Sequence, residues 1–115
     1  MGEQLPEVIL NYIEASNNYD ENGYADCFAE NGVIDEQSVG REFEGKEEIK
    51  EYFRDYFIDY KTSTKIKKYQ IEDNVVTVMV MFKGIFPNGD QGISGYYQFI
   101  LSPTGKIEKL IADLK

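Results

Sequence analysis

The spacing of hydrophobic positions changes near Lys61. Before that residue, apolar side chains recur every three or four positions, which is typical of amphipathic helices. After it, β-branched and aromatic residues form short runs between turn signals, which is typical of strands. No internal repeat, low-complexity tract or linker interrupts the chain. The pattern therefore predicts one α+β domain over residues 1–115, with the helices first and most of the sheet afterwards.

Two helices are predicted in the first part of the chain. Pro6 lies near the first turn of the first helix, where its missing N–H costs nothing. Asp20 can cap a second, short helix that ends at Asn31-Gly32. The apolar positions are Leu5, Val8, Ile9, Tyr12 and Ile13 in the first helix, and Tyr24, Cys27 and Phe28 in the second.

A third helix is predicted to begin at Gly45. Before it, Val33 to Glu36 are expected to form a short strand and Gln37 to Glu44 a loop. The helix carries an apolar stripe that is strongly aromatic. Its members are Ile49, Tyr52, Phe53, Tyr56, Phe57 and Tyr60.

The second part of the chain is predicted to form an antiparallel meander of four strands. Turn signals separate these strands at residues 72–74, 87–90 and 102–105. The strand from Val75 to Phe86 is apolar on both faces, whereas a sheet covered on one side should alternate more cleanly. The second apolar face would be covered by another copy of the chain, so we expect a homodimer through the outer face of the sheet; a wider two-layer core in a monomer is the alternative.

Composition and charge narrow the possible partners. The 42% hydrophobic content of 115 residues is enough for one core and too little for two domains. A formal net charge of −9 would repel phosphate backbones, so no nucleic acid is expected. No apolar run approaches the roughly 20 residues that cross a bilayer, and Met1 to Gln4 resemble no leader. These features predict a soluble cytoplasmic protein without a membrane partner.

The sequence offers few histidine or cysteine side chains for nucleophilic catalysis or metal binding. The sequence contains no histidine, which removes histidine-based triads and the usual zinc and haem sites. Its single cysteine, Cys27, cannot form an internal disulfide and is more typical of a packed side chain than of a nucleophile. We therefore expect neither a metal ion nor an organic cofactor.

Several segments resemble those of a known family. Tyr12 to Asp20, Cys27 to Gly32 and Gly45 to Ile49 are similar to the N-terminal half of ketosteroid-isomerase-like and SnoaL-like proteins, in the nuclear-transport-factor-2-like superfamily. Tyr97 to Phe99 and Gly105 to Ile107 are similar to the last hairpin of that family. The resemblance implies a cone-shaped α+β roll in which three N-terminal helices pack on the concave face of a curved, mostly antiparallel sheet. It also implies a hydrophobic cavity between the two layers.

The family resemblance also suggests catalytic residues. In ketosteroid isomerases a carboxylate base moves a proton next to a carbonyl, while a phenol and a protonated acid hold the developing enolate oxygen. Tyr12 stands where the family has its phenol. The family's base falls on Glu36 by ungapped counting, with Asp35 immediately before it. The second acid maps to Gly95 or Tyr97, neither of which is an acid, and Tyr97 would give a site with two tyrosines.

The same resemblance suggests which side chains contact a small apolar ligand. These candidates are Phe28, Phe53, Tyr56, Phe57 and Phe99. A helical aromatic stripe is also typical of an ordinary core, and a buried tyrosine often only packs. Only one of Asp35 and Glu36 can face the interior of a strand, and the pattern leaves open which one does.

Two interpretations remain after the sequence. One is a cofactor-independent isomerase or cyclase that transfers a proton next to a carbonyl. The other is a non-catalytic module of the same fold that binds a small apolar ligand or dimerises. A branch with an Asp-Arg-Asp site, as in similar epoxide hydrolases, is less favoured because Arg54 lies off the apolar stripe of its helix and Arg41 lies in the expected loop.

Overall fold

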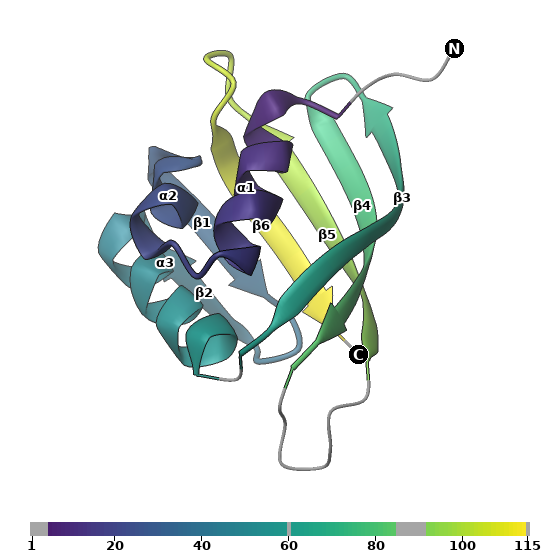
Figure 1. The fold of residues 1–115 in the computed structure, drawn as a ribbon. Coiled ribbons are helices and arrows are strands. Elements are labelled where there is room, and N and C mark those ends of the chain that lie inside the picture. The colour runs from purple at the N-terminus through teal and green to yellow at the C-terminus, as the bar shows by residue number, and fades with distance from the viewer. Residues whose placement is uncertain (1–4, 60, 85–91, 115) are drawn as a thin grey trace.

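Three helices cover the concave face of a curved sheet (Figure 1). The structure is a computed structural model that describes residues 5–59, 61–84 and 92–114, without the side chains of Ile93 and Leu114. The helices are α1 (Glu7–Asn17), α2 (Glu21–Asp26) and α3 (Gly45–Phe53), and α3 continues directly as the π-helix η1 (Arg54–Ile58). No helix within the described ranges is long and apolar enough to cross a membrane.

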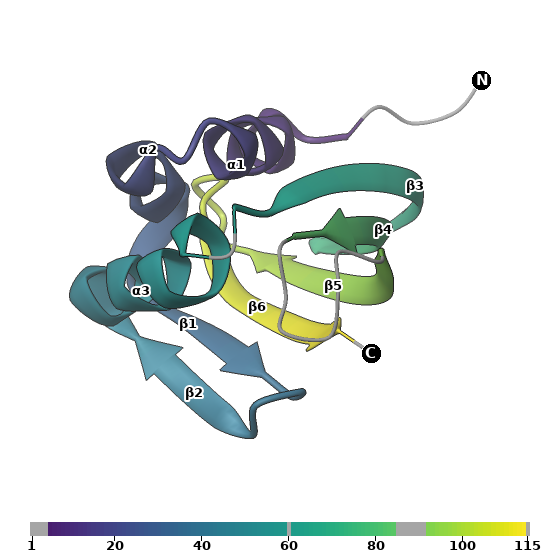
Figure 2. The same ribbon diagram turned by 60° about the horizontal axis from the view of Figure 1, so that its bottom comes forward.

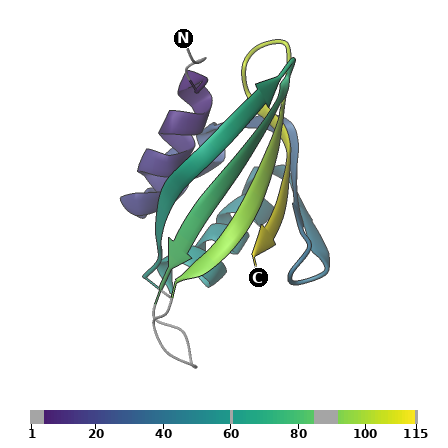
Figure 3. The ribbon, with the colours of Figure 1, turned by 90° about the vertical axis from the view of Figure 1, so that its right-hand side faces the viewer.

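The sheet has six strands in the order β2-β1-β6-β5-β4-β3 and does not close into a barrel (Figure 2). Its strands are β1 (Phe28–Glu36), β2 (Arg41–Glu44), β3 (Ser63–Glu72), β4 (Val75–Lys83), β5 (Ile93–Leu101) and β6 (Ile107–Leu114). All neighbouring pairs are antiparallel except β1 and β6, which run parallel. Figure 3 shows β3 to β6 side by side from their outer face, with the helices behind them. The predicted α+β class, three helices and four-stranded meander are confirmed.

The turn chemistry explains two of the meander's connections. Asp73 between β3 and β4 and Gly105 between β5 and β6 both have positive φ, at 56° and 84°. Glycine adopts this backbone conformation without strain, and aspartate tolerates it better than most residues do. The remaining predicted turn, at residues 87–90, lies outside the described residues, as do Tyr60, Ile85 and Phe86.

The second helix is shorter than predicted. Asp20 does cap it, accepting a hydrogen bond from the Gly23 N–H at 3.0 Å. The helix ends at Asp26, however, and Phe28 begins β1, so the prediction of a helix running to Asn31-Gly32 was wrong. The reason is tertiary pairing, because the Cys27 carbonyl accepts a hydrogen bond from Ile107 of β6 at 2.9 Å.

The predicted loop from Gln37 to Glu44 was also wrong in its second half. Arg41–Glu44 forms β2, which pairs with β1 in a register that sets Glu36 opposite Arg41. Phe43 is the only buried residue of this strand, so the sequence shows too little alternation to reveal it. The tight connection is closed by Gly40, whose N–H donates to the Glu36 carbonyl at 2.8 Å.

The core lies between the helices and the concave face and is rich in aromatic rings. Strand β4 shows how the sheet divides its side chains. Its inner residues are buried under the helices, as expected, while its apolar outer residues are half-buried. The inner set is Val76, Val78, Val80 and Phe82, and the outer set includes Val75, Met79 and Met81.

Candidate functional site

Glu36 is a buried carboxylate at the end of β1. Successive side chains of a strand point to opposite faces, and Ile34 and Glu36 take the inner one. Glu36 is only 2% exposed, whereas the neighbouring Asp35 is half-buried on the other face. The sequence left open which of the two acids faces the interior, and in the structure it is Glu36.

Two side chains hold the Glu36 carboxylate. The Tyr52 hydroxyl, from α3, donates a hydrogen bond to Oε1. The Ser38 hydroxyl donates to Oε2 at 2.6 Å, and the Ser38 backbone N–H donates to the same oxygen at 3.3 Å. Glu36 makes no ion pair with any described residue. A buried carboxylate without a cation costs stability, so its presence is typical of a functional group.

The strand register sets Glu36 and Tyr97 on either side of a small residue. Ala112 of β6 is paired with Glu36 of β1 and also with Tyr97 of β5. All three are buried, so their side chains share the inner face of one row across three strands. Because Ala112 carries only a methyl group, the row has its smallest side chain between a carboxylate and a phenol.

The Tyr97 hydroxyl makes no hydrogen bond of ordinary geometry to any described residue, although the residue is fully buried. Burial raises the pKa of this hydroxyl, and a weaker interaction with the Tyr12 hydroxyl acts to lower it. Tyr12 packs edge-on against Tyr97, with ring centroids 5.9 Å apart. The Tyr12 hydroxyl is itself 2.9 Å from the Tyr24 hydroxyl, and either can be the donor. Buried hydroxyls are normally paired, so the free donor of Tyr97 is unusual.

The tyrosines around Glu36 stay protonated at neutral pH. Burial raises the pKa of Tyr12, Tyr24, Tyr52 and Tyr97, and the negative charge of Glu36 raises each further. A phenol can donate a hydrogen bond only in its protonated form. The interior is therefore a set of neutral donors around one carboxylate.

The aromatic residues predicted to contact a ligand lie in the same interior, where they pack on one another. Tyr56 is half-buried, and the other members of the predicted set are almost completely buried: Phe28, Phe53, Phe57 and Phe99. Phe53 stacks on Tyr24 with ring centroids 4.3 Å apart. An open hydrophobic pocket at this place stays a prediction, because rings would have to turn to admit a ligand.

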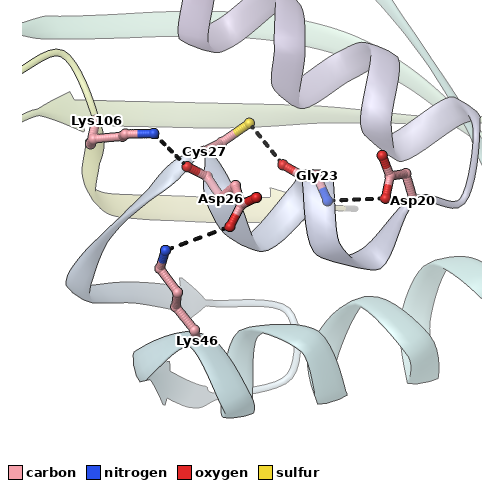
Figure 4. A network of polar contacts seen from close by, with 6 residues as sticks. All are labelled: Asp20, Gly23, Asp26, Cys27, Lys46 and Lys106. Atoms are coloured by element: carbon pink, nitrogen blue, oxygen red, sulfur yellow. Dashed lines mark hydrogen bonds and ion pairs between the residues drawn. The ribbon is translucent and has the colours of Figure 1, made fainter.

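A cavity of about 490 Å³ lies outside this interior, between α1, α2 and the turn that connects β5 to β6. Its lining includes the acidic residues Glu7, Glu14, Asp20 and Asp26, together with Cys27 and Lys106. Figure 4 shows part of the surrounding network, in which Lys106 donates to the Asp26 carbonyl at 2.8 Å and Lys46 lies 3.7 Å from the Asp26 carboxylate.

Cys27 in this network behaves as a packed side chain. Its thiol donates to the Gly23 carbonyl with a sulfur–oxygen distance of 3.3 Å, and the residue is 5% exposed. Burial raises the pKa of the thiol to about 11. A thiol with so high a pKa is protonated at neutral pH and a poor nucleophile, in agreement with the sequence interpretation.

Other candidate features of the sequence lie on the surface. Arg41 pairs with Glu51 at 3.5 Å and Arg54 with Glu21 at 3.4 Å, and both arginine side chains are 52% exposed. Neither arginine can therefore be the inward-facing arginine of an Asp-Arg-Asp site. Lysines of β3 and β4 border a second cavity, of about 560 Å³, at the β3 edge. Across the described ranges, no cluster of three or more His, Cys, Asp or Glu residues could hold a metal ion.

Sequence reasoning missed two residues that contact Glu36 and one that lies beside it. Tyr52 was noted only as a member of the apolar stripe, and its phenol reaches Glu36 because α3 packs against β1. Ser38 stood in an expected loop, and nothing in its sequence context indicates a bond to a buried acid. Ala112 becomes visible only through the register of β1, β6 and β5.

Comparison with known proteins identifies the family. The sequence model of the SnoaL-like domain matches residues 9–107, so the chain belongs to the SnoaL-like family. The fold is that of the ketosteroid-isomerase-like and nuclear-transport-factor-2-like proteins, as expected from the sequence. No curated protein matches the sequence.

Solved structures share this architecture at low sequence identity. A protein with a ketosteroid isomerase-like fold from Catenulispora acidiphila, in complex with trimethylamine, is 15% identical with a TM-score of 0.86, over 95% of this chain and 85% of that one. SalBIII, an epoxide hydrolase/cyclase-like enzyme in pyran ring formation in salinomycin, is 23% identical with a TM-score of 0.82, over 95% and 88%. RV0760c from Mycobacterium tuberculosis, in complex with estradiol-17beta-hemisuccinate, is 16% identical with a TM-score of 0.80, over 92% and 89%.

Proposed function

We propose that this chain binds a small apolar carbonyl compound inside the cone and transfers a proton at the carbon next to the carbonyl. The observation that carries the proposal is the row of Glu36, Ala112 and Tyr97, in which a methyl group is flanked by a buried carboxylate and by a phenol that makes no ordinary hydrogen bond to any described residue. A carbonyl compound lying over Ala112 would present its α-carbon to Glu36 and its oxygen to Tyr97.

In the proposed reaction Glu36 takes the α-proton as a general base, and the C–H electrons pass to the carbonyl oxygen to form an enolate. Tyr97 donates a hydrogen bond to that oxygen, and Tyr12 donates a second one when Tyr24 donates to Tyr12. The proton returns from Glu36 to another carbon in an isomerisation; in a cyclisation the enolate carbon attacks a second carbonyl, and the alkoxide that forms takes up the proton from Glu36. Neither route requires a metal ion or an organic cofactor.

Tyr52 and Ser38 act as positioning residues. Their hydrogen bonds to separate oxygens of the carboxylate restrict its rotation. A base that is held in place loses less entropy when it reaches the transition state. Phe28, Phe53, Tyr56, Phe57 and Phe99 would contact the apolar part of the ligand once their rings have turned.

Deuterium exchange tests the proposal. Small apolar ketones are incubated with the protein in D₂O, and loss of the α-proton signal is followed by NMR. The wild-type protein should accelerate exchange, and Glu36→Gln should lower the rate by about 10²- to 10⁴-fold. Asp35→Asn is the matched control, because it removes the adjacent carboxylate from the opposite face of the strand. Equal rates for Glu36→Gln and wild type would refute Glu36 as the base.

A non-catalytic binding module is the second candidate. It is favoured by the phenol of Tyr97 at the place of the family's second acid, and by the steroid derivative that a structural relative binds. A module of this kind would bind apolar ketones without accelerating exchange, and Glu36→Gln would leave their affinity unchanged.

A homodimer through the outer face of the sheet and a cytoplasmic location remain predictions. The dimer is supported by the half-buried apolar residues of β4 and by Tyr96 of β5, which is 53% exposed. Sedimentation velocity checks it: the wild-type protein should sediment as a dimer and Tyr96→Lys as a weaker one, whereas a monomeric wild-type protein would refute it.

A further inference from the structure

Two threonines near the start of β3 carry buried hydroxyl groups that make no hydrogen bond to any described residue. Thr62 is 1% exposed and Thr64 is 5% exposed, and neither hydroxyl makes a hydrogen bond within the described part of the chain. A buried hydroxyl without a partner costs free energy, so two of them in one short segment require an explanation.

The backbone of this segment is, by contrast, well supplied with partners. The side chain of Asn17, the last residue of α1, accepts a hydrogen bond from the Thr64 N–H at 2.8 Å and donates one to the Thr64 carbonyl at 3.1 Å. The Tyr19 hydroxyl donates to the Thr62 carbonyl at 2.9 Å, and the Thr62 N–H donates to the Phe57 carbonyl at 3.0 Å. The segment is therefore fixed from the side of α1, which leaves the two hydroxyls as its unused polar groups.

Both hydroxyls belong to the same inner face as Tyr97. Thr64 is the second residue of β3 and Thr62 lies one residue before that strand; both are buried, so we assign their side chains to the same inner side of the sheet. Thr64 is paired with Phe82 of β4, whose side chain is buried on the concave face. Tyr97 is paired with Val78, four residues back along β4, which is about 13 Å at the usual rise of a strand.

The π-helix η1 covers this end of the interior. Its i→i+5 hydrogen bonding is seen where the Asp59 N–H donates to the Arg54 carbonyl at 3.0 Å. The segment carries Phe57, which packs edge-on against Phe82 with ring centroids 5.2 Å apart. Short π-helical segments are rare in proteins, and those that occur are frequently found at functional sites. A shift of η1 would move the Phe57 ring away from the interior beside the two threonines.

We propose that Thr62 and Thr64 form a second polar anchor, which takes a hydroxyl or carbonyl oxygen at the far end of the ligand whose carbonyl lies at Tyr97. The preferred ligand is then an elongated apolar molecule with an oxygen at each end. This inference rests on the proposed function, because it takes the position of the first oxygen from it.

The test compares two probes that differ in one oxygen. Testosterone carries a ketone at one end and a hydroxyl at the other, and its deoxy analogue lacks the hydroxyl. Dissociation constants are measured for the full chain by isothermal titration calorimetry. The wild-type protein should bind testosterone about three- to tenfold more tightly than the analogue, and Thr62→Val/Thr64→Val should reduce that ratio to about one. Thr77→Val, on the outer face of β4, should keep the wild-type ratio.

Thermal unfolding of the free proteins supplies a second readout. Because the hydroxyls have no partner among the described residues, Thr62→Val/Thr64→Val should unfold at a temperature equal to or above that of the wild type.

An equal affinity of the wild-type protein for both probes would overturn the second anchor while leaving the first oxygen site intact. A lower unfolding temperature together with an unchanged ratio would mean that the hydroxyls hold only buried water. Failure of the wild-type protein to bind either probe would overturn the inference, and exchange with smaller ketones would then decide the proposed function separately.

Discussion

The interior around Glu36 and the surface cavity between α1 and α2 differ both in how much open space they contain and in how reactive their side chains are. The surface cavity has about 490 Å³ of space and a lining rich in carboxylates, but its cysteine is protonated and hydrogen-bonded. The interior is filled by aromatic rings, yet it holds a buried carboxylate and a phenol that has no ordinary hydrogen bond to the described part of the chain. In this molecule the open surface cavity and the groups best placed for chemistry therefore lie in different regions. A functional group is recognised by the cost of burying it.

After Glu36→Gln, replacing the phenol of Tyr97 should have the largest effect on exchange. Tyr97→Phe removes a donor aimed at the developing enolate oxygen, so the rate of ketone α-proton exchange should fall by about 10²- to 10³-fold. Stability should not fall, because the lost hydroxyl makes no ordinary hydrogen bond within residues 5–59, 61–84 and 92–114. Exchange by NMR and urea denaturation measure the two effects. Tyr96→Phe, the exposed neighbour on the outer face, is the control, and an equal loss of exchange in both variants would contradict the assignment.

Removing the Tyr52 hydroxyl should lower stability. Tyr52→Phe leaves the buried Glu36 carboxylate without one of its donors, and the free energy of unfolding should fall by about 1.5–3 kcal/mol in urea denaturation. In the Glu36→Gln background the same change should cost less, because a neutral acceptor binds the phenol more weakly. Tyr56→Phe controls for the loss of a hydroxyl from the same stretch of helix. Equal costs in both backgrounds would show that Tyr52 does not act through Glu36.

The smallest effect is expected at Cys27 in the surface cavity. The thiol pKa is raised from 9.0 to about 11 by burial, so the folded state binds this proton more tightly than the unfolded state does. The resulting contribution is present below pH 9 and is lost as the pH rises to about 11. Stability measured against pH should therefore fall more steeply in this window for the wild type than for Cys27→Ala. Identical slopes would place the thiol in contact with water.

The sequence predicted the class of fold and part of the site, and the differences have physical causes. Periodicity identified α1, α3 and the meander because each has several apolar residues at regular spacing. It failed for residues 28–32 and 41–44, where pairing with β6 and with β1 decides the conformation. Tyr12, Glu36 and Tyr97 came from family resemblance together with counting, and the structure brings all three to one interior. Ser38, Tyr52 and Ala112 depend on register and helix packing, which no local pattern records.

The proposed function requires ligands to bind in the interior row of Glu36, Ala112 and Tyr97 and not in the surface cavity. Backbone amide shifts test it most directly, with an apolar ketone titrated into isotopically labelled wild-type protein and followed by NMR. Progressive shifts are expected at Ser38 and Tyr97, beside the carboxylate and the phenol, and none at Gly23 and Gly105, which line the surface cavity. Shifts confined to Gly23 and Gly105 would contradict it.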